Sequence, residues 1–369
     1  MSAGTRLGSA VAVTLTVAVT TGTALLLSGC GPTDTARAAA PASAVGAVTS
    51  APTGAAPTST GTASGTPTGT AASTPAPTGS ASTPTGPGPA PSRSAPVPVL
   101  NGTANSRLTI SNGTSRVLMN GTSVDFGTVV RDLAWSPDGA KAAFVNGSGD
   151  LVVSNPDGSG RVTVARNPGG QTWSHPTWQV TAADSRYGNP ARNNLFFTVS
   201  QGGVARLEGV SATGAAAPTV LGLDAEGGSY PNPIPQTGNA WPNTGGSHGS
   251  TVYANSTTGQ VYIRDDYLRE QVSPVAQGSE PALSPDGTAV AFVRSSGGHD
   301  HIFEQGLGDN SAARDITPAA TTDYTEPAWS PDGRTIAVRT PVGISTVPAD
   351  GSAAPTQVST VPGLPAYRG

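Results

Sequence analysis

Residues 134–139 read Ala-Trp-Ser-Pro-Asp-Gly, and the phrase returns as Ala-Leu-Ser-Pro-Asp-Gly at 282–287 and as Ala-Trp-Ser-Pro-Asp-Gly at 328–333. Proline fixes φ near the value that a turn requires, aspartate accepts hydrogen bonds from nearby backbone, and glycine permits a positive φ. The turn residues are Pro137, Asp138 and Gly139, then Pro285, Asp286 and Gly287, then Pro331, Asp332 and Gly333. We interpret each copy as a strand, a tight turn and a second strand.

A short apolar run of strand length follows each of these Ser-Pro-Asp-Gly turns. After the first copy, two more such runs appear at 150–154 and 161–164, separated by another turn at 155–158. Four antiparallel strands within roughly 40 residues are typical of one blade of a β-propeller. The sequence therefore predicts an all-β fold built from repeated blades.

Weaker copies of the repeat fill the intervals between the strong ones. With Trp135, Trp178, Pro233, Leu283 and Trp329 taken as equivalent, successive copies are 43, 55, 50 and 46 residues apart. Spacings near 45 residues fit blades, and the longer ones leave room for loop insertions.

Three further strand-like pieces lie between residues 107 and 130, separated by Asn112-Gly113 and Asn120-Gly121, which favour hairpin turns. They predict one more blade. We expect six four-stranded blades over residues 99–369, with five or seven also compatible with the spacing. The ring would close by pairing a terminal strand with the other end of the domain, since closure removes exposed sheet edges.

The beginning of the chain has the pattern of an export signal. Residues 1–6 carry one positive charge, residues 11–27 are mostly apolar, and Leu-Ser-Gly precedes Cys30, the sole cysteine. This setting closely resembles the lipobox of bacterial lipoproteins, in which the cysteine is lipidated and becomes the new N-terminus. The resemblance implies a signal peptide over 1–29 and a lipid anchor on Cys30 at the extracytoplasmic face of the cell membrane. The alternative is an ordinary secretory signal that contains one cysteine.

Residues 31–98 consist almost wholly of Ala, Pro, Ser, Thr and Gly, with three charged residues and no aromatic one. Such a segment buries too little apolar surface to offset its ordering entropy. We therefore expect residues 30–98 to be a disordered stalk that begins at the lipidated cysteine and reaches roughly 45 Å. Its Ser and Thr residues fit a glycosylated stalk and an unmodified linker equally well.

Charge and cysteine content exclude several classes of protein. The net charge is −4, and no basic stripe is present, so nucleic acid is not an expected partner. A single cysteine provides no disulfide framework. No cofactor-binding motif was found, so no cofactor is predicted.

The repeat itself is similar to a known family. Pro-Ala-Trp-Ser-Pro-Asp-Gly followed by an Ala-Phe-Val or Ile-Ala-Val strand resembles the WD40-like β-propeller repeat of the TolB type, common in extracytoplasmic bacterial proteins. The resemblance covers residues 100–369 and implies a propeller fold. It implies no single activity, because propellers serve as binding modules and as enzymes.

Two motifs invite a catalytic or metal-binding interpretation. Residues 245–249 match Gly-x-Ser-x-Gly, but a nucleophile elbow needs a strand before it and a helix after it, and this stretch has no helical continuation. His299-Asp300-His301 would require a further ligand from elsewhere to hold a metal, and we interpret these histidines as solvated loop residues. We therefore predict no catalytic residue and no metal site.

The stretch from 223 to 251 is long and irregular and contains Tyr230, Trp241 and His248. Long loops on a rigid scaffold often carry recognition, so these three residues are the candidate binding residues. The alternative is that Trp241 covers the edge of a degenerate blade. We expect a module that binds another envelope protein or a cell-wall component, with a propeller hydrolase or lyase acting on an extracellular or cell-wall substrate as the main alternative and a structural spacer as a third.

Overall fold

The computed structural model describes residues 100–369, except 215, 224–232 and 268–270. The predicted signal peptide over 1–29, Cys30 and the predicted stalk to residue 98 lie outside the described residues, and so does Tyr230. No helix in the described part of the chain is long and apolar enough to cross a membrane.

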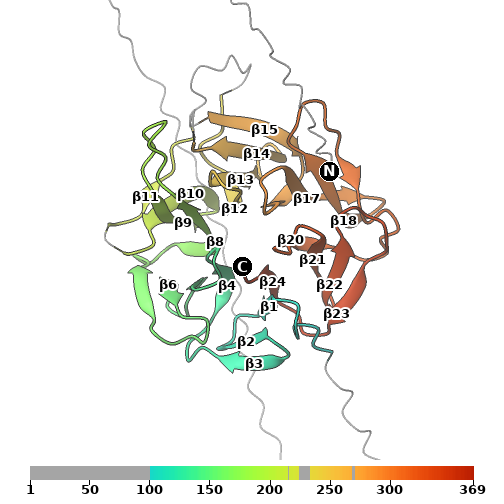
Figure 1. Ribbon diagram of the computed structural model, residues 1–369, viewed down its shortest axis with the longest axis horizontal. Helices are drawn as coiled ribbons and strands as arrows, with labels where there is room; N and C mark the ends of the chain where they lie inside the picture. Colours follow the sequence, from blue (N-terminus) through green and yellow to red (C-terminus); the bar gives the residue numbers. More distant parts are fainter. Residues whose placement is uncertain (1–99, 215, 224–232, 268–270) are drawn as a thin grey trace, which may run out of the picture. The chain divides into compact units, whose positions relative to one another are not determined.

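In the described residues, six four-stranded antiparallel sheets are arranged as blades around a common centre (Figure 1). This confirms the predicted six-bladed all-β propeller. Blade 1 contains β24 (Leu364–Tyr367), β1 (Leu108–Ser111), β2 (Arg116–Met119) and β3 (Thr122–Asp125), and blade 2 contains β4 (Arg131–Trp135), β5 (Ala142–Val145), β6 (Leu151–Ser154) and β7 (Val162–Ala165). Blade 3 contains β8 (Thr172–Thr181), β9 (Arg192–Gln201), β10 (Val204–Ser211) and β11 (Thr219–Val220).

Blades 4 to 6 follow in chain order. Blade 4 contains β12 (Asn239–Gly245), β13 (Ser250–Asn255), β14 (Gln260–Asp265) and β15 (Gln271–Gln277). Blade 5 contains β16 (Ser279–Leu283), β17 (Ala289–Ser296), β18 (His299–Gly306) and β19 (Arg314–Asp315), and blade 6 contains β20 (Thr325–Trp329), β21 (Thr335–Thr340), β22 (Gly343–Pro348) and β23 (Thr356–Ser359). The first strand named in each blade is its inner strand, nearest the ring centre (Figure 1).

The ring closes within blade 1, where the last strand, β24, pairs with β1. Leu108 lies opposite Tyr367 and Ser111 opposite Leu364 in an antiparallel register. The Thr109 hydroxyl also donates a hydrogen bond to the carbonyl of Ala366, at 2.8 Å. The expected closure by terminal strands is therefore confirmed.

The hydrophobic core lies between neighbouring blades. All four residues of β5 and all four of β6 are buried, because both faces of this sheet pack against another sheet. One apolar cluster joins Val145 and Leu151 of blade 2 to Trp178 and Phe197 of blade 3. Among the described residues, corresponding clusters fill the other interfaces, and the last of them joins blade 6 to blade 1.

Tryptophans at one repeat position bind blades 2, 3 and 6 to the preceding blade. The indole N–H groups donate to neighbours on the previous blade: Trp135 to the Thr109 hydroxyl (2.9 Å), Trp178 to the Ala134 carbonyl (3.2 Å) and Trp329 to the Ala282 carbonyl (3.0 Å). Trp135 is 8% exposed, and Leu283, at the same position of blade 5, is 4% exposed. Packing between blades therefore explains why the repeat favours a large side chain here.

The predicted equivalence of Pro233 is wrong. In blade 4 the inner strand begins at Asn239, after Pro233. Thr244 pairs with Thr251 in the register in which Trp135 pairs with Ala142, so Thr244 occupies the repeat position. The sequence comparison failed because a small polar residue replaces the tryptophan in this blade.

The Ser-Pro-Asp-Gly turns share one set of hydrogen bonds. In the first, the Ser136 hydroxyl donates to the Asp138 carboxylate (2.6 Å), and the Ala140 N–H donates to the same carboxylate (3.0 Å). The Gly139 N–H donates to the Ser136 carbonyl (2.8 Å). Gly139, Gly287 and Gly333 have φ values of 65°, 74° and 70°, the left-handed region in which glycine has no steric penalty.

Two of these glycines separate backbone strain from crowding. A Cβ added at Gly333 would meet no heavy atom within 4 Å, whereas one added at Gly139 would lie 2.6 Å from the Gly369 carbonyl oxygen. We expect Gly333→Ala to lower the free energy of unfolding by about 1 kcal/mol, from positive φ alone. Gly139→Ala should lower it further. Urea unfolding of both variants measures the difference, and equal losses would contradict the role given to the Gly369 contact.

Candidate functional site

A β-bulge interrupts the inner strand of blades 2 to 6 near its start. The pairing register shifts between Arg131 and Ala134 in β4, and at the corresponding places in β8, β12, β16 and β20. One residue in each bulge has a positive φ without being glycine: Asp132 (54°), His175 (50°), Trp241 (54°), Glu280 (49°) and Glu326 (50°). Such strained residues and bulges concentrate at functional sites. The repetition of this geometry therefore directs attention to the ring centre.

The five bulge residues line a central cavity of about 430 Å³. Inner strands of all six blades contribute to its wall, including Leu364 to Tyr367 of β24. The Ser-Pro-Asp-Gly turns, which follow the inner strands, contribute Pro137, Pro285 and Pro331 to the same wall. Figure 1 shows the C-terminus at the same centre, and the volume falls within the range of small-ligand sites.

An ion pair spans this cavity between opposite blades. His175 Nε2 of blade 3 lies 3.2 Å from Glu326 Oε1 of blade 6, and the two side chains are 25% and 20% exposed. Blades 3 and 6 are three positions apart in the six-membered ring. The contact therefore crosses the axis and does not link neighbouring blades.

Two other carboxylates hold the bulges of adjacent blades together. The backbone N–H of His175 donates to the carboxylate of Asp132 in blade 2 (3.1 Å), and the backbone N–H of Glu326 donates to the carboxylate of Glu280 in blade 5 (2.7 Å). In blade 4 the backbone N–H of Trp241 donates instead to the Thr198 hydroxyl of blade 3 (3.1 Å). Asp132 and Glu280 therefore have a structural role as well as a charge that faces the cavity.

Burial and neighbouring charges shift the pKa values of two cavity residues. Burial, followed by the nearby charge of Glu326, raises the pKa of Glu280 to about 7. For His175, burial opposes protonation, but the hydrogen bond to Glu326 and the charges of Glu326, Asp132 and Glu280 outweigh it and raise the pKa. The raised pKa favours the protonated form of His175 beside Glu326, while Glu280, with a pKa of about 7, exchanges its proton near neutral pH.

Trp241 lies in this cavity, on a strand. Residues 239–245 form β12, so the prediction of a loop that is irregular throughout 223–251 is wrong for this part. The Trp241 ring is half-buried against the apolar cluster of blades 4 and 5, and its centroid lies 6.1 Å from that of His175. Trp241 thus shares the cavity wall with the other bulge residues, and His175 is the one whose ring lies beside it.

The third candidate, His248, does not line the cavity. It is exposed in the turn between β12 and β13 and stacks on the ring of Tyr267, with centroids 4.1 Å apart. The Tyr267 hydroxyl donates to Asp184, and the Tyr267 carbonyl accepts a hydrogen bond from Asn189 (2.8 Å). His248 and Trp241 therefore belong to different environments.

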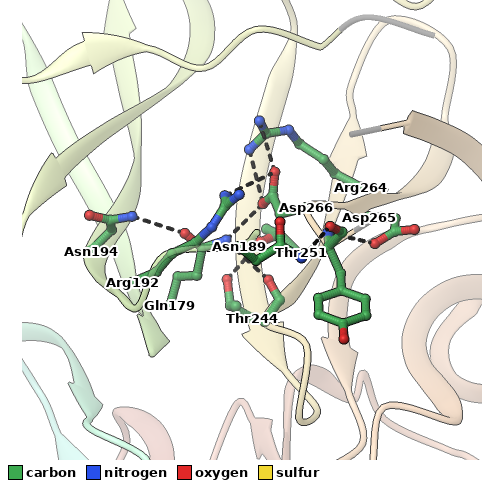
Figure 2. Close-up of polar contacts among 11 residues, drawn as sticks. Gln179, Asn189, Arg192, Asn194, Thr244, Thr251, Arg264, Asp265 and Asp266 are labelled. Atoms are coloured by element: carbon green, nitrogen blue, oxygen red, sulfur yellow. Dashed lines mark hydrogen bonds and ion pairs between the residues drawn. The ribbon is translucent and has the colours of Figure 1, made fainter. Parts of the chain in front are cut away.

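A buried polar network next to Tyr267 ties blades 3 and 4 together (Figure 2). The Asp266 carboxylate, with no exposed side-chain surface, lies 2.9 Å from Arg264 and accepts a 2.8 Å hydrogen bond from Gln179 of β8. Asn194 of β9 in turn donates to the Gln179 side chain (3.0 Å). We assign this network a structural role, because its charged groups bind one another across the blade interface.

The two other sequence motifs have structural surroundings. Residues 245–249 cover the end of β12 and the turn into β13, a second strand and not a helix, so no nucleophile elbow forms. The interpretation of both histidines as solvated loop residues is wrong, because β18 begins at His299 and buries His301, which is 5% exposed and 2.8 Å from Asp315. His299 remains partly exposed beside Asp323. Within the described residues, no group of three or more His, Cys, Asp or Glu is arranged to hold a metal.

Sequence reasoning missed Asp132, His175, Glu280 and Glu326. Each lies three residues before the repeat position of its blade, and all but Asp132 directly precede a proline. That fixed offset is the signal that could have found them.

Comparison with known proteins supports the fold. No protein-family model and no curated protein matches the chain. TolB from Acinetobacter baumannii superposes with a TM-score of 0.50 at 18% identity, over 71% of this chain and 65% of that protein, so the match spans a little under two thirds of the TolB length. A TolB-type protein from Agrobacterium tumefaciens has a TM-score of 0.46 at 17% identity (69% and 89% covered), and an oligogalacturonate lyase in complex with manganese has 0.41 at 11% identity (66% and 70%). Structural neighbours thus include TolB-type propellers, and at these identities the likeness concerns the fold.

The raised pKa of Glu280 predicts a pH-dependent stability. Between the ordinary value of 4.5 and about 7, the folded state keeps a proton that the unfolded state loses, so stability falls as pH rises through this window. The Glu280→Gln variant has no proton to lose in this window, and its amide oxygen can still accept the hydrogen bond from the backbone N–H of Glu326. We expect it to exceed the wild type by about 1–3 kcal/mol at pH 8, with most of the gain gone at pH 5. Urea unfolding at both pH values tests this, with the exposed Asp125→Asn as control; a gain independent of pH would contradict it.

Proposed function

We propose that the protein is a membrane-anchored, extracytoplasmic binding module that takes part of an envelope protein or a cell-wall component into the central cavity. The observation that supports this most is the set of five strained bulges. Together they place three carboxylates, a histidine and a tryptophan on one cavity, although packing alone would be satisfied by regular strands. Repeated strain at one place is what a preorganised binding site requires.

The proposed location rests on the sequence before the propeller. The lipobox-like setting of Cys30 supports a lipid anchor, and the Ala-, Pro-, Ser-, Thr- and Gly-rich composition of residues 31–98 supports a flexible stalk. Such a stalk would let the propeller reach partners in a layer above the membrane. A binding module gains from the anchor, because attachment to the membrane raises the local concentration of the cavity, and from a stalk long enough to span the distance to its partner.

The alternative function, a hydrolase or lyase, would use the same cavity. Glu280 has a pKa near 7, which suits a group that transfers protons at neutral pH. The two functions are distinguished by the fate of the bound molecule. A binding module releases it unchanged, whereas an enzyme releases a cleaved product that mass spectrometry detects.

Trp241→Ala should weaken partner capture strongly, since an aromatic ring in a cavity contributes more to binding than to folding. Because Trp241 is half-buried, its loss should cost less than the about 3–5 kcal/mol of a core tryptophan. Capture is measured by cross-linking the full chain in solubilised membranes. Tyr187→Ala is the matched control, because Tyr187 is 51% exposed and lies outside the cavity. Equal capture by the wild type and Trp241→Ala would exclude the cavity as the binding site.

Cys30→Ala tests the anchor. Without the thiol no lipid can be attached, so we expect the variant to leave the membrane fraction or to retain its signal segment. Fractionation with and without detergent, combined with the mass of the mature chain, makes the measurement. If a variant whose mass shows that residues 1–29 have been removed still requires detergent for release, the anchor does not depend on Cys30.

A further inference from the structure

The charged groups of the cavity are unequally divided. Among the described residues that line it are three carboxylates, Asp132, Glu280 and Glu326, and one histidine, His175, with no lysine or arginine. The His175–Glu326 pair is neutral when the histidine is protonated. Asp132 is a further carboxylate of the wall, and Glu280 adds a negative charge as its proton leaves. The cavity therefore carries net negative charge with no basic side chain of its own to balance it.

The surroundings strengthen this field. A partly enclosed cavity focuses charge, because its walls have a lower dielectric constant than water. Asp132 and Glu280 cannot turn away easily, since each accepts the backbone N–H of the next blade. Their negative charges are thus fixed at the ring centre.

Trp241 adds a second kind of cation-binding surface. Its ring is half-buried beside His175 and belongs to the same cavity wall as the carboxylates. Ammonium and guanidinium groups are attracted to the face of an indole ring, most strongly where water is excluded. The aromatic face attracts a cation through its π electrons, so it is an observation separate from the negative charge of the carboxylates.

We propose that the central cavity binds the ammonium or guanidinium group of an organic cation. The inference rests on the proposed function, in which the partner supplies this group on a lysine, an arginine or an amino terminus. The carboxylates would repel an anionic ligand. An apolar ligand would remove water from the carboxylates without supplying a hydrogen bond or an opposite charge in its place. A cavity of about 430 Å³ also has room for an organic group beyond the charged atoms.

Proton linkage supports the inference. A bound cation favours the ionised form of Glu280, which faces Glu326, His175 and Asp300, and Asp132 adds negative charge near His175. If only ionised Glu280 accepts the cation, affinity should be about tenfold weaker at pH 6 than at pH 8. Deprotonation of His175 acts in the same direction, because it leaves Glu326 unneutralised.

The experiment titrates the full chain with acetylated tetralysine, tetraarginine and tetraglutamate, and with spermidine, following Trp fluorescence and heat at pH 6 and pH 8. We expect a basic peptide to bind and the acidic one not to bind. Glu280→Gln should reduce the affinity by at least about tenfold and abolish most of its pH dependence. Asp125→Asn, which removes the same charge from an exposed outer strand, should bind as the wild type.

The outcomes separate the two proposals. Absence of binding by every basic probe, or equal affinity in the wild type and Glu280→Gln, overturns the cation site. If partner capture still depends on Trp241 in that case, the proposed function stands with a ligand of another class. Binding of spermidine equal to that of the peptides identifies a free amine as the source of the cation, and preference for the peptides identifies a protein segment. The stability measured for Glu280→Gln ensures that weak binding is not a folding defect.

Discussion

The fold depends on one constraint: each blade has two apolar faces and can bury both only between two other blades. β5 illustrates this, with Phe144 packed toward blade 1 and Val145 toward blade 3. An open row of such sheets would leave one apolar face exposed at each end. The pairing of β24 with β1 removes those ends, because it completes blade 1 between blades 6 and 2. Closure of the ring is thus a requirement of the core.

In blades 2 to 6 the inner strand also has one position, at the bulge, whose residue lines the central cavity. Residues at the repeat position, such as Trp178, pack between blades, whereas the bulge residue three positions earlier turns to the ring centre. Packing between blades therefore explains the large side chain at most repeat positions of this chain, whereas of the five bulge residues Trp241 alone packs against an apolar cluster. The bulge position therefore accepts a carboxylate in three blades, a histidine in blade 3 and a tryptophan in blade 4, so the scaffold can vary its cavity without altering its core.

The difference between these positions explains what sequence reasoning could reach. The blades were predictable because the Ser-Pro-Asp-Gly turns specify local geometry that repeats in the chain. Blade 4 was misaligned because Thr244 stands where the repeat has a large residue. The cavity was missed because His175 and Glu326 are 151 residues apart, and the offset that they share, three residues before a repeat tryptophan, does not by itself show that the side chains meet at the ring centre. The burial of His301 was missed because the two glycines at 297 and 298 indicate a turn but not how soon the next strand begins. Pairing with β17 starts β18 at His299, and this places His301 inside the sheet.

Closure by the final strand also sets an order on folding. The Thr109 and Ala366 hydrogen bond joins residues 257 positions apart, so blade 1 is completed last as the chain is synthesised. Until β24 arrives, β1 presents an unpaired edge, and unpaired edges are where chains associate wrongly. Long-range closure is also intrinsically slow. A chain truncated before residue 364 would keep five complete four-stranded sheets and a three-stranded blade 1 with the edge of β1 unpaired, so the last strand decides whether the ring ends as a closed structure or as one open to wrong association.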